Sequence, residues 1–207
     1  AEGEEKRRYA MKLYPFSALL SRMRYINRWG LMRAARQENL AEHTAETAQL
    51  AHLLALIAAR QFAAQVAPER VAVAALYHDA AEILTGDLPT PVKYSSALLK
   101  DAYKALERQA EQRLSALAPP EIQPQLASAI CGGALAEREK KILKAADRLS
   151  ALIKCIEERQ SGNLEFASAE AAQRAALAAM ELPEVEYFIQ TMLPAYTRTL
   201  DELKAEK

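Results

Sequence analysis

The sequence predicts an all-α fold, a compact bundle of about seven to nine helices that forms one domain over residues 11–207. Hydrophobic residues make up 51% of the 207-residue chain, which is enough for a sizeable core. Alanine is abundant, whereas the chain has 6 glycines, 4 phenylalanines and few valines, a composition that disfavours sheets. Apolar residues recur at helical spacing in most segments, and proline or glycine separates these segments.

The N-terminal part contains a charged arm, a first helix and an irregular segment. Residues 1–10 are highly charged and precede Met11, so we interpret them as an expression remnant or a short arm outside the fold. Residues 15–26 carry an apolar stripe at helical spacing. The period breaks after this stripe, where Arg28 precedes Trp29, the only tryptophan. This pair can hold a phosphate beside a sugar. Alternatively, the indole fills the core and the guanidinium faces solvent.

The next predicted helix begins at Glu42 and runs to about Phe62. His43 lies near its beginning, where the preceding loop can open onto a cleft. His52 follows nine residues later, a separation that turns a helix by about 900°. The two imidazoles therefore face opposite sides. We expect His43 to belong to a shared site and His52 to be an ordinary core or surface residue.

His78 and Asp79 lie on a helix predicted over residues 68–84. On that helix Glu82 is rotated by only about 40° from His78, so one imidazole and two carboxylates share a face. Such a face can hold a cation, although a buried His–Asp pair that satisfies itself is the alternative. Residues 85–91 follow as a stiff polar loop with one glycine and two prolines. The alternative for this loop is a simple rigid turn with a capping aspartate.

The C-terminal half is expected to contain five more helices. In the third of them, Asp147 lies among small apolar neighbours, which allow a carboxylate to sit deep in a packed site. The sequence shows no glycine-rich phosphate loop, internal repeat or low-complexity segment. The five helices are expected at about residues 97–117, a shorter stretch ending near residue 130, then 137–159, 165–180 and 184–203.

Charge, cysteine usage and hydropathy limit the classes of partner. The 27 Lys and Arg residues balance 27 Asp and Glu residues, which disfavours a nucleic-acid polymer but suits a small anion held by one or two arginines. Cys131 and Cys155 are too few for a disulfide framework or a thiolate zinc site, so we expect both to be reduced. No apolar run approaches the roughly 18 residues of a membrane span, and no signal-peptide pattern opens the chain. We expect a cytoplasmic protein with no membrane partner.

Three parts of the chain supply side chains typical of metal ligands. They are His43, the pair His78 and Asp79, and Asp147. Two imidazoles and two carboxylates form a nitrogen and oxygen set suited to zinc or another transition metal, with room left for water. The pattern H…HD…D is similar to the signature of the HD-domain phosphohydrolases, and its strength comes from the surrounding sequence.

The surrounding segments resemble the bacterial HD-domain 5′-deoxynucleotidases over about residues 11–203. The polar loop with its prolines is the most specific of them. Gly30 stands where close relatives are expected to have proline, and residues 131–133 replace a more polar stretch, but neither departure touches an expected ligand. The matching segments are Asn27-Arg28-Trp29, Glu42-His43-Thr44, His78-Asp79-Ala80-Ala81-Glu82, Thr85-Gly86-Asp87-Leu88-Pro89-Thr90-Pro91-Val92-Lys93 and Lys144-Ala145-Ala146-Asp147.

The resemblance implies a reaction and a set of residue roles. It implies a homodimer that hydrolyses 2′-deoxyribonucleoside 5′-monophosphates to deoxynucleoside and phosphate, with metal-bound water as the nucleophile. Glu82 and Arg28 would be the catalytic residues. One divalent ion, Co, Mn or similar, would be held by His43, His78, Asp79 and Asp147. The residues implied in substrate binding are Arg28, Trp29, Asp79, Asp87, Leu88, Pro89, Thr90 and Asp147.

The physical chemistry of these residue types agrees with that reaction. A metal lowers the pKa of bound water, and Arg28 adds a fixed positive charge for the phosphoryl oxygens. Glu82 can carry a proton between the water and the leaving oxygen. Trp29 is bulky enough to close the space that a 2′-hydroxyl needs, and Asp87 can accept a hydrogen bond from the 3′-hydroxyl.

Three alternatives remain open from the sequence. The same fold can act on a nucleoside triphosphate or a cyclic diester, although a triphosphate would ask for more basic residues than Arg28 and Lys93. A redox di-iron bundle needs paired Glu-x-x-His units, and no histidine here follows a glutamate at that spacing. In a non-enzymatic helical scaffold the histidines and aspartates would be structural, and the metal content of the purified protein would separate these classes.

Overall fold

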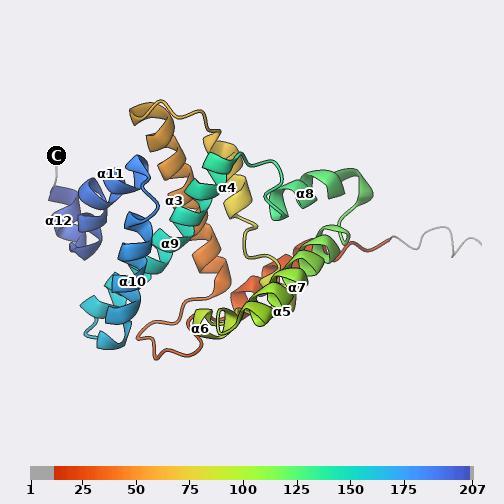
Figure 1. The fold of residues 1–207 in the computed structure, drawn as a ribbon, viewed down its shortest axis with the longest axis horizontal. Helices are drawn as coiled ribbons and strands as arrows, with labels where there is room; N and C mark the ends of the chain where they lie inside the picture. Colours follow the sequence, from red (N-terminus) through yellow and green to blue (C-terminus); the bar gives the residue numbers. More distant parts are fainter. Residues whose placement is uncertain (1–11, 206–207) are drawn as a thin grey trace, which may run out of the picture.

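A computed structural model describes residues 12–205, and these residues form helices joined by turns and loops (Figure 1). They contain no β-strand, and the one bridge of that kind among them is isolated and joins Asn27 to Asn39. The all-α prediction is therefore confirmed. The charged arm of residues 1–10 lies outside the described residues.

Three helices form the centre of the bundle: α3 (Leu40–Gln61), α4 (Pro68–Ala75) and α9 (Glu137–Gln160). Helix α3 packs against both of the others, and alanines on all three allow close approach of their backbones. This central packing contains the larger hydrophobic core and provides the frame for the site. Its buried members include Leu54, Ala55, Val71, Ala146, Leu149 and Leu152.

The C-terminal helices cover one side of this centre (Figure 1). Helix α10 (Ala167–Ala178) packs against α9, and α11 (Pro183–Thr191) packs against α3. The prediction of one long helix over residues 184–203 is wrong. After α11 the chain continues as a 3-10 helix at Leu193–Thr197 and then as α12 (Leu200–Ala205). Pro194 explains the break, since proline lacks the N–H that continues an α-helix.

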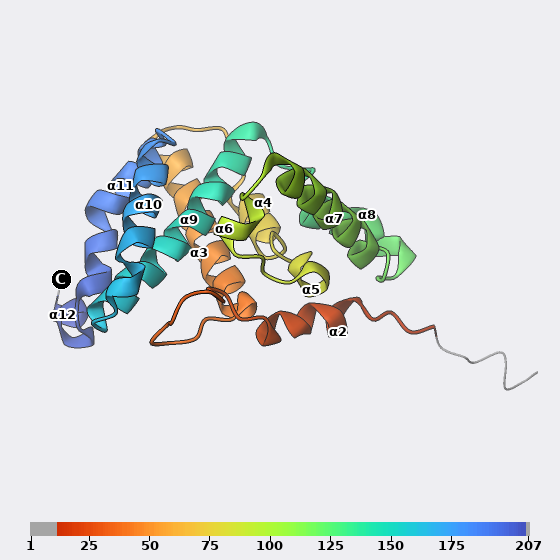
Figure 2. The ribbon, with the colours of Figure 1, turned by 60° about the horizontal axis from the view of Figure 1, so that its bottom comes forward.

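The opposite side of the bundle holds α7 (Ala97–Ser115) and α8 (Gln123–Ile130), joined through a 3-10 turn at Pro120–Ile122. Helix α2 (Phe16–Leu20) continues as a 3-10 helix at Ser21–Tyr25, and Figure 2 shows α2 along one edge of the molecule. These elements share a second, smaller hydrophobic core cluster. Its members are Ala80, Leu114 and Ile130, with Phe16, Leu19, Leu20, Tyr77, Ile83 and Leu126 packed against them.

The helix predicted over residues 68–84 is interrupted where the expected site residues lie. Turns at residues 76–81 separate α4 from α5 (Glu82–Thr85). In these turns backbone bonds span three residues, as in the bond from the Ala80 N–H to the Tyr77 carbonyl. Ala80 and Tyr77 both pack into the second core cluster, and this packing accounts for the end of α4 at Ala75.

This interruption corrects the geometric argument made from the sequence. His78 and Glu82 do not share one helical face, because no continuous helix runs through both. The polar loop after α5 is also shorter than expected, since it ends in the short helix α6 (Thr90–Lys93). The described chain therefore has more helical segments than the seven to nine expected.

None of the helices within residues 12–205 combines the length and apolar character that crossing a membrane requires. Cys131 and Cys155 are both free thiols, as expected.

Candidate active site

The four residues expected as metal ligands converge in the structure. His43, on α3, and His78 and Asp79, in the turns after α4, each offer a ligand atom within 4.8 Å of the other two. Asp147, on α9, places Oδ1 3.2 Å from Nε2 of His43 and 4.0 Å from Nε2 of His78. His52 is half-buried farther along α3 and does not belong to the cluster. Two imidazoles and two carboxylates thus meet at one point between the central helices.

The orientation of His78 is set by a backbone carbonyl. Its Nδ1 lies 2.8 Å from the carbonyl oxygen of Ala75, to which it can only donate. In that tautomer Nε2 keeps its lone pair, and within residues 12–205 this buried atom has no hydrogen-bond partner, although Oδ2 of Asp79 lies 3.2 Å away. A buried, unpaired nitrogen acceptor beside a carboxylate fits a metal cation.

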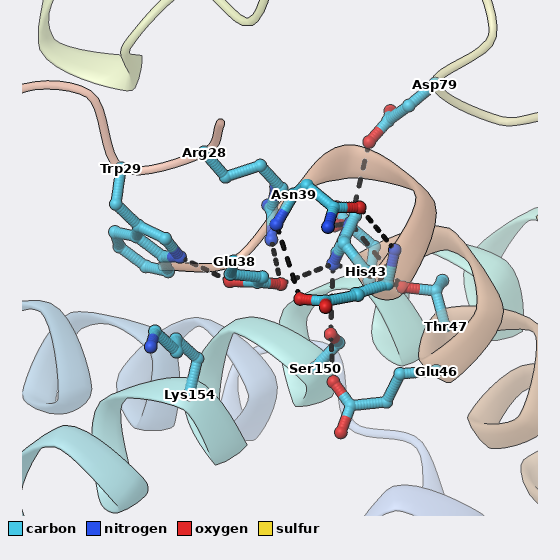
Figure 3. A network of polar contacts seen from close by, with 12 residues as sticks. Arg28, Trp29, Glu38, Asn39, His43, Glu46, Thr47, Asp79, Ser150 and Lys154 are labelled. Atoms are coloured by element: carbon cyan, nitrogen blue, oxygen red, sulfur yellow. Dashed lines mark hydrogen bonds and ion pairs between the residues drawn. The ribbon is translucent and has the colours of Figure 1, made fainter. Parts of the chain in front are cut away.

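His43 is oriented by a series of polar contacts on its other side (Figure 3). Its Nδ1 lies 3.0 Å from Oγ of Ser150, and that hydroxyl donates to Glu46 at 2.5 Å. The series leaves Nε2 of the fully buried ring directed at Asp79 and Asp147, at 3.5 and 3.2 Å. Contacts of this kind fix the tautomer and the ring plane of a metal-binding histidine.

The electrostatics of the cluster favour positive charge. Burial lowers the pKa of the His78 imidazole, but the carboxylates of Asp79 and Asp147 outweigh burial and raise this pKa to about 9. Burial raises the pKa of Asp147, whereas the imidazoles of His43 and His78 hold it well below its ordinary value. The carboxylates are therefore ionised at neutral pH and stabilise a positive charge between them, which is a proton on the imidazole without metal and a metal cation when one displaces that proton.

Glu82 lies close to the cluster but contributes no atom to it. Burial, assisted by the negative charges of Asp79 and Asp87, raises the pKa of Glu82 to about 9. Its Oε2 is buried and finds no hydrogen-bond partner in the described part of the chain. A carboxyl group that keeps its proton at neutral pH is suited to act as a general acid.

Arg28 and Trp29 share one acceptor, the carboxylate of Glu38 (Figure 3). Nη1 of Arg28 donates to Oε1 at 3.0 Å, and Nε1 of Trp29 donates to Oε2 at 2.7 Å. The indole also packs against Phe166, with ring centroids 5.2 Å apart. The alternative in which the indole fills the core and the guanidinium faces solvent does not hold, because Arg28 is largely buried and Trp29 borders a pocket.

A pocket of about 770 Å³ opens beside the ligand cluster. Asp147 belongs both to the cluster and to the pocket wall. Leu88 is half-buried and does not line the pocket, although its neighbours in the loop do. The expected site residues that line it are Arg28, Trp29, Asp87, Pro89, Thr90 and Asp147.

Several polar residues of the site were missed from the sequence. The sequence around Glu38 carries no pattern that predicts its role, because the side chains that it contacts come near it only when the loop before α3 folds. The beginning of α3 was detectable, since Asn39 and Glu42 form a capping box that starts the helix at Leu40. Ser150 and Glu46 likewise act through contacts between separate helices. Further pocket residues not anticipated are Lys144, Arg148 and Gln173.

Comparison with known proteins agrees with the fold and with the family resemblance seen in the sequence. Residues 15–196 match the family described as 5′-deoxynucleotidase YfbR-like. A 5′-deoxynucleotidase from Cronobacter sakazakii is 45% identical over 92% of this chain and 96% of its own length. The 5′-deoxynucleotidase YfbR from Shigella dysenteriae is 44% identical over 95% of this chain and 98% of its own length.

Solved structures show the same architecture. An HD-domain phosphohydrolase from Listeria innocua has a TM-score of 0.76 at 24% identity and covers 92% of both chains. A cyanophage S-2L HD phosphohydrolase, bound to dA and one catalytic Zn²⁺ ion, has a TM-score of 0.63 at 19% identity, with 86% of this chain and 96% of that one covered. The chain belongs to the YfbR-like family of HD-domain 5′-deoxynucleotidases.

Proposed function

We propose that this enzyme hydrolyses 2′-deoxyribonucleoside 5′-monophosphates to a deoxynucleoside and inorganic phosphate with one divalent metal ion. The activity is that of the family to which the chain belongs. The observation that carries the proposal is the position of Asp147, which joins the cluster of metal-type ligands to the wall of a nucleotide-sized pocket.

The metal would be held by His43, His78, Asp79 and Asp147. The fit rests on the buried, unpaired Nε2 of His78 and on the mixed nitrogen and oxygen donor set, which suits Zn, Co or Mn. When bound, such an ion lowers the pKa of a coordinated water, the nucleophile, and neutralises phosphate charge. A related HD phosphohydrolase of the same fold binds one catalytic Zn²⁺.

Arg28 and Glu82 supply the positive charge and the proton. Arg28 lines the pocket, and its bond to Glu38 uses one N–H of Nη1, so other N–H donors of the guanidinium can donate to phosphoryl oxygens. Glu82 holds its proton at neutral pH and delivers it to the 5′ oxygen as the bond to phosphorus breaks.

Trp29 and Asp87 both line the pocket and select the sugar. The indole closes the space that a 2′-hydroxyl would occupy, and the Asp87 carboxylate accepts a hydrogen bond from the 3′-hydroxyl. Pro89 and Thr90 also line the pocket, whereas Leu88 is half-buried beside it in sequence and does not. Asp79 and Asp147 would act on the substrate through the metal that they would hold.

A substrate panel tests the proposal. The metal-loaded protein is assayed for phosphate release from deoxyribo- and ribonucleoside 5′-monophosphates, nucleoside triphosphates and cyclic dinucleotides. We expect the highest kcat/KM for the deoxyribonucleoside 5′-monophosphates and loss of activity after chelation. Equal kcat/KM for ribo- and deoxyribonucleotides would refute the proposed sugar selection, and preference for a triphosphate or a cyclic substrate would refute the substrate class.

We also propose a homodimer in the cytoplasm. Large apolar side chains exposed along α7 support an interface, since Leu98 is 82% and Leu106 48% exposed. The two free thiols suit a reducing compartment. Light scattering coupled to size-exclusion chromatography tests the dimer, and a monomeric mass at micromolar concentration would rule it out.

A further inference from the structure

One carboxylate connects two functional side chains of different kinds. Glu38 accepts from the guanidinium of Arg28 through one oxygen and from the indole of Trp29 through the other, at 3.0 and 2.7 Å. The same Oε1 lies 3.5 Å from Nδ1 of His43. Glu38 is 8% exposed, so these contacts form away from bulk water, where hydrogen bonds to a charged group are strong.

The backbone around Glu38 holds the same loop from a second direction. The Arg28 N–H donates to the Glu38 carbonyl at 2.9 Å, and the Leu40 N–H donates to the Ile26 carbonyl at 2.8 Å. These two bonds fasten residues 26–28 to the chain that begins α3. The two bonds therefore fix the position of the loop relative to α3, the helix that carries His43.

The conformation of Trp29 needs such support. Its backbone lies in the left-handed region, with φ of 62°, which a bulky residue adopts only when its surroundings fix it. Packing against Phe166 orients one face of the ring, but a ring contact alone leaves the indole free to slide. The bond from Nε1 to Glu38 fixes the remaining freedom of the side chain.

From these contacts we propose that Glu38 is a positioning residue. Its carboxylate holds the phosphate-binding Arg28 and the sugar-selecting Trp29 in place at the same time. A single carboxylate thereby determines both how tightly the 5′-monophosphate binds and how strictly the 2′-hydroxyl is excluded. The inference rests on the roles proposed above for Arg28 and Trp29. Glu38 itself touches neither the substrate nor the metal.

Glu38→Gln is the direct test, because it preserves shape but removes one acceptor. The amide oxygen can still accept from one donor, whereas the amide nitrogen faces the other donor and cannot accept. We expect the KM for a deoxyribonucleoside monophosphate to rise about tenfold and the deoxyribo-to-ribo ratio of kcat/KM to fall by a similar factor. Both are measured on protein with verified metal content.

Glu42→Gln is the matched control. It makes the same chemical change four residues later, and glutamine still satisfies the capping box with Asn39. We expect this variant to keep the wild-type KM and the wild-type ratio. Equal losses in Glu38→Gln and Glu42→Gln would show a general disturbance of the beginning of α3 and would overturn the proposal.

The single tryptophan gives a second readout that does not depend on activity. Its fluorescence reports on the Nε1 contact directly, so Glu38→Gln should shift the emission maximum and increase quenching by acrylamide. Glu42→Gln should change neither. Unchanged emission and quenching in Glu38→Gln would show that Glu38 does not hold Trp29 in solution and would overturn the inference.

A second variant tests the inference in case Glu38→Gln does not fold. Trp29→Phe keeps an aromatic ring and leaves the bond from Arg28 to Glu38, but it removes the Nε1–H donor, so the deoxyribo-to-ribo ratio of kcat/KM should fall. An unchanged ratio contradicts the inference. If the wild-type enzyme itself does not discriminate between ribo- and deoxyribonucleotides, it is the proposed function that fails, whereas the fluorescence comparison still tests the contact.

Discussion

At the scale of single residues, both histidines proposed as metal ligands are oriented by a neighbour. The Ala75 carbonyl directs His78, Ser150 directs His43, and the two imidazoles face Asp79 and Asp147. Such contacts keep the donor atoms converged before a metal binds, which reduces the reorganisation that binding requires. The same contacts explain why substitutions at the ligands should have a larger effect than substitutions at other histidines.

His78→Ala and Asp147→Ala are each expected to lose the metal and the activity together, since removal of one of four donors severely weakens a site. Metal content per chain is measured by elemental analysis after dialysis against a weak chelator. His52→Ala is the control, because His52 is outside the cluster and should retain both metal and activity. A full complement of metal in Asp147→Ala would remove Asp147 from the ligand set.

Glu82→Gln is expected to retain metal and substrate binding while kcat falls by roughly 10²- to 10⁴-fold, the usual contribution of a proton-transferring group. The amide cannot deliver the proton that Glu82 holds at neutral pH. Metal analysis and steady-state kinetics on the same preparation provide the measurement. Loss of metal in this variant would instead make Glu82 a ligand.

At the scale of elements, the turns between α4 and α5 are as important as the helices. They allow Tyr77 and Ala80 to pack into the second core cluster while His78 and Asp79 face the other way. In a continuous helix successive side chains are about 100° apart, so Tyr77 and Ala80 would not be directed away from His78 and Asp79 as they are here. The loop from α5 to α6 then carries Asp87 to the pocket.

Gly86 makes that loop possible, because it ends α5 with φ of 76° and ψ of 160°, a combination that is almost exclusive to glycine. We expect Gly86→Ala to destabilise the protein by about 1–3 kcal/mol and to raise the KM, because Asp87 is displaced. Urea unfolding and steady-state kinetics measure the two effects.

Gly133→Ala is the control for this substitution. A Cβ at either glycine meets no atom of residues 12–205 within 4 Å, but of these two glycines Gly86 alone has a positive φ. The control should therefore change stability and KM little. Equal effects at the two positions would show that the backbone conformation of Gly86 is not the cause.

At the scale of the whole molecule, the site loop is tied to the central helices by a buried acidic residue. Glu158, on α9, accepts from the amides of Ala35 and Arg36, from Lys154 Nζ at 2.6 Å and from Asn163 Nδ2 at 2.8 Å. These bonds hold the loop between α2 and α3 against α9. Removal of the carboxylate leaves Lys154 buried without its counter-charge.

Glu158→Ala is expected to cost roughly 3–5 kcal/mol of unfolding free energy at neutral pH, the usual effect of breaking a buried ion pair from one side. Stability should also depend on pH. Burial raises the pKa of Glu158, but Lys154 and the other donors outweigh burial and lower this pKa from 4.5 to about 2. The contribution is complete above pH 4.5 and is lost as the pH falls towards about 2.

Urea unfolding of the wild type and of Glu158→Gln across this pH range tests the assignment. Glutamine cannot ionise, so the difference in stability between the two proteins should shrink as the pH falls. A difference that stays constant between pH 5 and pH 2 would show that the Glu158 carboxylate is not the titrating group.

The sequence determined the fold class, most helix positions and the identity of the candidate ligands, because these follow from local composition, periodicity and a recognisable pattern. The comparisons confirm the family and the fold. Tertiary structure decided the interruption at residues 76–81, since the second core cluster pulls Tyr77 and Ala80 away from helical geometry. It also decided the role of Glu38, because a carboxylate in a loop acquires a function only when distant donors fold onto it. Local sequence carries helix propensity, whereas contacts between separate segments depend on the packing that brings them together.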